Sequence, residues 1–362
     1  MGAGARPVLS WLFRRWFPKG GFVAFITAVE APKQVDPDKP YFSNIASTRL
    51  RVLIPARQLA RRVPVWLVPM AELMRRPDLG HLGQAGAIVL GKLSTRDLVA
   101  NKEHLAALLD RLGGAAQKLY ADLSDDYAAL GKEMGEPFLA QYQENLGRRC
   151  HLVVPSAALS QSVARDAKRG MTVIEDPYES AAARPVRAAA STPLRLAWFG
   201  NLGSVNRAEL EQAFARIASL PIQLEIVAGD AAREMVLAMA QRLPFPVSFT
   251  AWSLEATEEA IERSDFVLLP QDHHSSWARV KSHNRMVSAI RGGRLAVASP
   301  IPAYEELAAF GWVGEDLAEG LRWAIAHPHE AAARVSAGQQ YVESRFAPDA
   351  IGRKWAEALG IR

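Results

Sequence analysis

The sequence predicts an α/β protein built from two doubly wound lobes, and three observations support this prediction. The chain has 362 residues, whereas one domain usually has about 100 to 200. Its second half alternates short apolar runs with helical periods, which is typical of a parallel sheet covered by helices. An alanine-rich segment, residues 180–193 (SAAARPVRAAASTP), separates two patterned halves and has the composition of a linker.

These features predict four parts of the chain. We expect residues 1–185 to form the first lobe and residues 186–193 to form the linker. Residues 194–345 should form the second lobe. Residues 346–362 should form a helix that packs back on the first lobe, because a helical pattern continues beyond Pro348. Two such lobes in series place a ligand cleft between the carboxyl ends of their sheets.

Apolar runs and helical periods locate the individual elements. In the second lobe, the expected strands are residues 194–199, 222–228, 247–250, 266–269 and 295–298, with helices at about 207–219, 231–242, 254–263 and 284–291. In the first lobe, the expected strands are 22–27, 65–68, 87–90, 118–122, 151–155 and 172–174, and the clearest helices are 49–62, 104–112 and 156–168. Asn206 is expected to cap the first helix of the second lobe, with Glu209 at its third position, and Ser253 the third helix.

The composition excludes several classes of protein. A hydrophobic content of 49% and a charged content of 22% are typical of a globular chain. No apolar run approaches the ~20 residues that cross a bilayer, and the first 20 residues lack a signal peptide, so we expect a cytoplasmic protein. Cys150 is the single cysteine, which excludes an internal disulfide, and we expect it to be buried. The aromatic and basic segment Trp11–Phe17 either packs on the first lobe or makes a peripheral contact with the inner face of the membrane.

A basic run precedes the second strand of the first lobe. Five arginines fall in fourteen residues without one acid: Arg49, Arg51, Arg57, Arg61 and Arg62. This pattern suits an anionic partner, and a solvated helix face is the alternative. Ser47, Arg49 and Arg51 are therefore predicted to bind an acceptor or a phosphate group, although helix capping by Ser47 explains part of the pattern. Nucleic acid is not expected as a partner, because no nucleic-acid-binding motif accompanies the arginines.

A glycine loop follows the first strand of the second lobe. Gly200, Asn201, Gly203 and Ser204 lie between that strand and the helix after it. Strand, glycine loop and helix together can bind a phosphate, because glycines let backbone N–H groups approach an anion at a helix N-terminus. The loop is not G-x-G-x-x-G and has no acidic partner about twenty residues further on, which disfavours a nicotinamide enzyme.

A polar segment follows the fourth strand of the second lobe. It contains Lys281, Ser282, Asn284 and Arg285, in positions where a packing helix would be apolar. If the helix already includes Lys281, this lysine shares a face with Arg285, and both supply donors for a pyrophosphate. The amide of Asn284 can bind a ribose or sugar hydroxyl.

The stretch DFVLLPQ...KSHNRMVSAIRGGRLAVASPIPAYEEL, which contains these residues, resembles the nucleotide-sugar region of GT-B glycosyltransferases related to the glycosyltransferase four family. The resemblance covers most of residues 118–310 and points to a divergent bacterial branch. It implies two Rossmann-like lobes facing across a cleft, and a donor site that contains Lys281, Asn284, Arg285 and Glu305 or Glu306. The family's pair of glutamates would fall on Val280 and Ser288, so this chain departs from the family there.

Further residues are candidates for the chemistry itself. The segment YADLSDDY, residues 120–127, resembles a strand end of the same branch. Asp125 or Asp126 in it could act as the base on an acceptor hydroxyl, and capping of the next turn by one of them is the alternative. His273 lies in a loop beside the expected cleft. A histidine pair without a carboxylate at a ligand spacing is a poor metal signal, so no metal site is predicted.

These observations together predict a glycosyltransferase. It would move a hexose-like unit from a nucleotide diphosphate sugar to a glycan or lipid-linked acceptor in bacterial surface polysaccharide synthesis, without a metal or another cofactor. Two alternatives stay open. A nucleotide-sugar epimerase would turn over the donor without any acceptor, and a non-catalytic glycan-binding or scaffold protein would bind ligand without consuming it.

Overall fold

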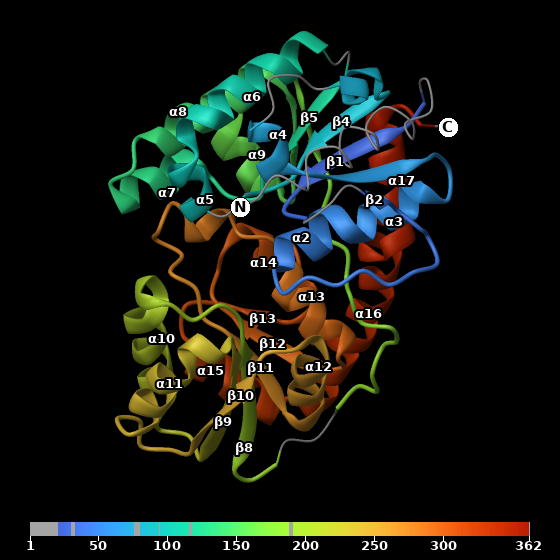
Figure 1. Ribbon diagram of the computed structural model, residues 1–362. Coiled ribbons are helices and arrows are strands. Elements are labelled where there is room, and N and C mark those ends of the chain that lie inside the picture. Colours follow the sequence, from blue (N-terminus) through green and yellow to red (C-terminus); the bar gives the residue numbers. More distant parts are fainter. Residues whose placement is uncertain are drawn as a thin grey trace, which may run out of the picture. The chain divides into compact units, whose positions relative to one another are not determined.

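The computed structural model describes residues 21–29, 33–75, 80–93, 95–115, 118–187 and 191–361. These residues form two compact units, each built on a mainly parallel sheet with helices on its faces (Figure 1). The first unit comprises the chain up to Pro177 together with the segment from Pro348 onward, and the second runs from Tyr178 to Ala347. The predicted α/β class with two such sheets is confirmed.

The sheet of the first unit has seven strands in the order β2-β3-β1-β4-β5-β6-β7. The strands are β1 (Val23–Thr27), β2 (Lys33–Gln34), β3 (Val65–Pro69), β4 (Ala87–Leu90), β5 (Leu119–Asp122), β6 (His151–Val154) and β7 (Met171–Val173). Neighbouring strands are parallel except β2, which pairs antiparallel with β3. The sequence did not predict β2, because an exposed strand of two residues has no apolar pattern.

Helices complete the first unit. They are α2 (Ala46–Thr48), the π-helical turn η1 (Arg49–Leu53), α3 (Ile54–Ala60), α4 (Met70–Arg75), η2 (Gly80–Gln84), α5 (Thr95–Ala100), α6 (Lys102–Ala115), α7 (Tyr127–Met134), α8 (Phe138–Arg149), α9 (Ala157–Val163) and α17 (Pro348–Leu359). The predicted helix 49–62 therefore begins at Ala46. The C-terminal helix α17 packs against α3, and its Ile351 and Trp355 share one apolar core with Leu59.

The sheet of the second unit has six parallel strands in the order β10-β9-β8-β11-β12-β13. They are β8 (Leu194–Phe199), β9 (Ile222–Ala228), β10 (Val247–Ala251), β11 (Phe266–Leu269), β12 (Leu295–Ala298) and β13 (Trp312–Val313). The five predicted strands are present, and β13 adds a short edge. Since every neighbouring pair is parallel, all carboxyl ends meet at one edge of the sheet, where ligands bind in open α/β sheets.

Helices cover both faces of the second sheet. They are α10 (Ser204–Arg216), η3 (Asp230–Ala232), α11 (Arg233–Ala240), α12 (Leu254–Arg263), η4 (Ala278–Val280), α13 (Asn284–Arg291), α14 (Pro302–Glu305), η5 (Ala308–Phe310), α15 (Leu317–Ala326) and α16 (Pro328–Phe346). Figure 1 shows α10, α11 and α15 on one face, and α12, α13 and α16 on the other. Leu210, Phe214 and Leu321 of the first group share a core with Trp198 and Ile226 of the strands.

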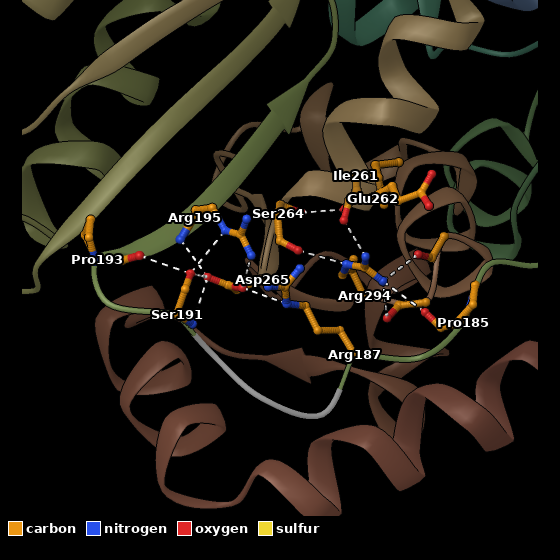
Figure 2. Close-up of polar contacts among 12 residues, drawn as sticks. Pro185, Arg187, Ser191, Pro193, Arg195, Ile261, Glu262, Ser264, Asp265 and Arg294 are labelled. Atoms are coloured by element: carbon orange, nitrogen blue, oxygen red, sulfur yellow. Dashed lines mark hydrogen bonds and ion pairs between the residues drawn. The ribbon is translucent and has the colours of Figure 1, made fainter.

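The described part of the predicted linker is packed on the second unit. Figure 2 shows Asp265 accepting hydrogen bonds from the backbone N–H of Ser191 and Arg195 and forming an ion pair with Arg187, whose Nε lies 2.8 Å from Oδ1. Arg294 donates to the Pro185 carbonyl at 3.0 Å. These bonds hold residues 185–187 and 191–195 on the second unit. The boundary between the units lies at Pro177, before the predicted position at 185.

Local predictions about caps and burial had different outcomes. Ser253 caps α12, since its side chain accepts a hydrogen bond from the Ala256 N–H at 2.9 Å. The predicted cap at Asn206 is wrong, because α10 begins at Ser204 and Asn206 lies inside its first turn. Cys150 is fully buried before β6, as predicted, and burial raises the pKa of its thiol to about 12.

Candidate functional site

The carboxyl edge of the second sheet brings together two parts of the predicted donor site. Strand β8 ends at Phe199, and Gly200 turns the chain toward α10. Helix α13 begins after the loop that follows β11. A β-carbon at Gly200 would lie 3.3 Å from Nη1 of Arg285, so the arginine head lies against the glycine turn. The absence of a side chain at Gly200 is what lets the guanidinium approach the backbone.

The guanidinium of Arg285 is available to a ligand. Arg285 is the second residue of α13, and no side chain caps this helix N-terminus. Within the described part of the chain, the Arg285 guanidinium has no hydrogen bond and no ion pair. A helix N-terminus carries a partial positive charge and free N–H groups. Arginine and helix end together therefore form a positively charged, half-buried corner suited to an anion.

The rest of the predicted donor segment lies around this corner. Lys281 ends η4 in an extended conformation, so it shares no helical face with Arg285, and that expectation is wrong. Its Nζ lies 3.5 Å from the centroid of the Trp277 ring. Asn284 is the first residue of α13, and Ser282 is half-buried just before it. In the glycine loop, Asn201 is exposed and Gly203 half-buried, while Ser204 begins α10 and its side chain lies outside the described ones.

A cavity of about 520 Å³ lies at the same edge of the sheet. Its walls are α10, the loop after β11, Ser299 after β12, and the residues before α15. Glu209 of α10 lines it, and burial together with the negative charge of Asp272 raises the pKa of Glu209 to about 7, against the opposing effect of Arg285. The spacing of Glu209 to Asn206 matches a capping box, and this local pattern predicts only a place at a helix start. Its position in the cavity follows from the tertiary fold.

His273, a predicted catalytic residue, also lines this cavity. Its Nε2 lies 3.5 Å from Oε1 of Glu315, and the rings of His273 and His274 are 4.0 Å apart. The Nε2 atom is buried and makes no hydrogen bond with the described residues. The structure thus places His273 next to the donor corner, and its part in catalysis stays a prediction.

Of the two candidate glutamates, Glu306 is the one that contacts the donor segment. Glu305 ends α14 with an exposed side chain. Oε2 of Glu306 lies 3.0 Å from Nε2 of His283, which is 2% exposed and directly precedes α13. The glutamate of the resembling family segment therefore supports the start of α13 through His283.

The two aspartates of the first unit have different surroundings. Asp126 caps α7, since its side chain accepts from the Ala129 N–H at 3.0 Å, and it also accepts a hydrogen bond from the Ser162 hydroxyl. The capping alternative therefore holds for Asp126. Asp125 is 6% exposed and pairs with Lys92. It remains the candidate base of this unit.

The basic run has a structural role at two predicted positions. Arg51 is 1% exposed, and its Nη2 lies 2.8 Å from Oδ1 of Asp122. Its Nη1 lies 3.3 Å from Asp176. A side chain enclosed in this way cannot bind an acceptor, so the prediction for Arg51 is wrong. Arg49 is also buried and donates to the Ser43 carbonyl at 2.7 Å, while Ser47 is half-buried in α2.

Among the described residues, no helix combines the length and the hydropathy that crossing a membrane requires. The segment Trp11–Phe17, to which a peripheral membrane contact was assigned, lies outside the described residues.

Comparison with known proteins shows which solved structures have a similar fold. No family model and no curated protein matches the chain in sequence. Among solved structures, HepE of Anabaena in complex with UDP and glucose superposes with a TM-score of 0.63 at 14% identity, over 94% of this chain and 99% of that one. TarM of S. aureus, in complex with UDP among other ligands, gives 0.58 at 12% identity and covers 76% of this chain.

The chain spans only 55% of the length of the TarM chain. The lipopolysaccharide outer core galactosyltransferase WaaB gives a TM-score of 0.53 at 10% identity, over 94% of this chain and 99% of that one. The chain therefore has the GT-B fold of these glycosyltransferases.

Proposed function

We propose that the protein is a glycosyltransferase that uses a nucleotide diphosphate sugar as donor. The observation that carries the proposal is the unpaired guanidinium of Arg285 at the start of α13, held against Gly200 at the carboxyl edge of a parallel sheet. Phosphate groups bind at such helix N-termini in α/β proteins. The presence of UDP in the HepE and TarM complexes supports a nucleotide as a ligand of this protein.

The corner also supports the chemistry of transfer. When the bond between sugar and diphosphate breaks, negative charge accumulates on the leaving diphosphate. A fixed guanidinium and the N–H groups of a helix end stabilise that charge without rearrangement, which is electrostatic catalysis. This mechanism needs no metal ion. On the acceptor side, Asp125 is assigned the role of base, because Asp126 is engaged in capping.

The acceptor is proposed to be a glycan or a lipid-linked sugar of bacterial surface polysaccharide or glycoconjugate synthesis. Support comes from WaaB, whose described role is in the lipopolysaccharide outer core, and from the resemblance of the donor segment to a bacterial branch of the glycosyltransferase four family.

The test begins with binding. Thermal unfolding with ADP, CDP, GDP, TDP and UDP should show stabilisation of the wild type by one nucleotide, because a ligand of the folded state raises its melting temperature. Arg285→Ala should abolish the shift. Arg279→Ala is the matched control, since Arg279 is an exposed arginine of η4 only six residues away. If no nucleotide shifts the wild type, the proposal fails.

Turnover then separates the alternatives. Release of nucleoside diphosphate that depends on an acceptor glycan supports transfer, and Asp125→Asn should slow this release while nucleotide binding is kept. Conversion of the sugar without an acceptor would indicate an epimerase. Binding of the nucleotide sugar without any turnover over a broad acceptor panel would indicate a non-catalytic protein.

A further inference from the structure

The first unit contains a cavity of its own, with a volume of about 270 Å³. Residues that directly follow β1 and β3 line it, and so does Leu93, which lies just after β4. These three strands are parallel neighbours in the sheet, so their carboxyl ends lie at one edge. Ligands of open α/β sheets bind at such an edge. The cavity therefore lies where a ligand of the first unit is expected.

The walls of this cavity are mainly apolar. The apolar lining residues are Ala28, Val29, Met70, Ala71, Met74 and Leu93. Met70 and Met74 are four residues apart on α4, so their side chains lie on one face of that helix. A methionine side chain is flexible and adapts to apolar groups of different shape. Such walls gain free energy when an apolar ligand removes their surface from water.

The polar part of the lining disfavours other ligands. It consists of Asp97, Asn101 and His104, around the junction of α5 and α6. The described lining contains no lysine or arginine, so a phosphate or carboxylate would lack its usual partner and would meet the charge of Asp97. It also contains no phenylalanine, tyrosine or tryptophan on which a nucleobase could stack. The amide of Asn101 donates to the Asp97 carbonyl at 2.8 Å. A hydrocarbon is the ligand that fits best.

The cavity is connected to the candidate base Asp125 through Leu93. Leu93 directly follows Lys92, whose Nζ forms an ion pair with the Asp125 carboxylate. The hydroxyl of Tyr127, two residues beyond Asp125, donates to the Leu93 carbonyl at 3.5 Å. An acceptor whose hydroxyl reaches Asp125 would therefore have its adjoining atoms beside the cavity.

We propose that this cavity binds a hydrocarbon chain of the acceptor, so that the acceptor is a lipid-linked sugar and not a free glycan. The inference rests on the proposed function, because it assigns the chain to the acceptor of that reaction. Binding of the chain would hold the acceptor hydroxyl near Asp125, and positioning of this kind contributes to the rate of a transfer between two substrates. A free sugar would gain no affinity from the cavity.

The experiment measures how affinity depends on chain length. Methyl, butyl, hexyl, octyl and decyl β-glucoside are titrated into the full chain by ligand-observed NMR, below their micelle-forming concentrations and without nucleotide. Burial of one methylene should tighten binding about fourfold. Since the cavity is finite, we expect this gain to stop once the chain fills it. Adsorption to an open apolar surface would continue to increase with every added methylene.

Two variants locate the binding in this cavity. Ala71→Trp should fill it and remove the dependence on chain length, and Ala71 is exposed, so the larger side chain does not crowd the core. Met74→Gln should weaken octyl glucoside, because it places a polar group in the wall. Ala100→Trp is the matched control, since Ala100 is also exposed on a nearby helix but does not line the cavity. It should match the wild type, and thermal unfolding checks that every variant is folded.

The inference and the proposed function can fail separately. If UDP binds the wild type but not Arg285→Ala, while the affinity for glucosides is independent of chain length or rises equally in wild type and Ala71→Trp, the cavity is no lipid site and the proposed function stands. If chain-length dependence with a limit appears and is lost in Ala71→Trp, while no nucleotide binds, the cavity is a lipid site and the glycosyltransferase proposal fails.

Discussion

Nη1 of Arg285 would lie 3.3 Å from a β-carbon at Gly200, so the guanidinium of the second unit's anion corner rests on a position where any side chain would crowd it. A contact of this length requires a neighbouring group to give way by a few tenths of an ångström. The backbone of Gly200 is held by a hydrogen bond from its N–H to the Val227 carbonyl at 3.1 Å. The same β-carbon would lie 3.3 Å from Cζ2 of Trp198, but that ring is enclosed in the core. The flexible arginine head would therefore be the group that moves.

Gly200→Ala is accordingly expected to displace the Arg285 head and weaken UDP binding about tenfold, the effect of losing one charge-assisted hydrogen bond. Calorimetric titration with UDP measures this. Gly229→Ala is the control, because a β-carbon at Gly229, which follows β9, would meet no atom within 4 Å. Equal affinities of the two variants would contradict the placement of the diphosphate at Arg285.

The raised pKa of Glu209 predicts a pH dependence of stability. Its pKa is about 7 in the folded protein and 4.5 ordinarily, so the folded state holds more protons between these values. The free energy of unfolding therefore falls as pH rises through this window. Glu209→Gln should remove this contribution, so its melting temperature should decrease less than that of the wild type between pH 5 and pH 8.

Glu211 serves as the control for this titration, because its pKa is shifted in the opposite direction to that of Glu209. A hydrogen bond from Arg207 lowers the pKa of Glu211, so ionised Glu211 favours the folded state at neutral pH. Glu211→Gln should leave the decrease between pH 5 and pH 8 in place. Parallel melting curves of Glu209→Gln and the wild type across this range would refute the assignment to Glu209.

Arg51 is expected to be a determinant of stability. Its charge is enclosed with those of Asp122 and Asp176, and removing one partner of a buried ion pair usually costs about 3–5 kcal/mol because the remaining charge is unpaired. Urea unfolding of Arg51→Met should show a loss of this size. Arg61→Met, at an exposed position, should stay within about 0.5 kcal/mol of the wild type. A fully stable Arg51→Met protein would contradict the buried role.

His283 and Glu306 are expected to act as a pair. A double-mutant cycle of His283→Ala and Glu306→Ala, measured by urea unfolding, should give a coupling energy of about 1 kcal/mol, as for other hydrogen-bonded neighbours. The cycle of His283→Ala with Glu305→Ala should give about zero, because His283 contacts Glu306 and not Glu305. Additive effects in the first cycle would show that the 3.0 Å contact contributes nothing to the fold.

The segment 178–195 shows why composition misplaces a boundary between units. Its alanines, serines and prolines have no periodic pattern, and this is typical of a linker. Its residues 185–187 and 191–195 are nevertheless held to the second unit by Asp265 and Arg294. The bond from Arg294 to the Pro185 carbonyl joins residues 109 apart in the chain, which no local pattern reports.

The sequence by itself determined the two parallel sheets, most strand positions, the cap at Ser253 and the segment that contains Arg285, because these depend on periodicities and spacings of a few residues. Only the tertiary structure decided which polar residues are buried, which meet and which face a cavity. Arg51 and Asp122 are 71 residues apart, yet they form one enclosed pair, and Glu209 has the spacing of a capping residue but lines the cavity. The burial of a side chain, and the charges that lie near it from distant parts of the chain, depend on which elements the fold packs together. The local sequence pattern of a helix start carries no information about the side chains that the helix faces in the folded protein.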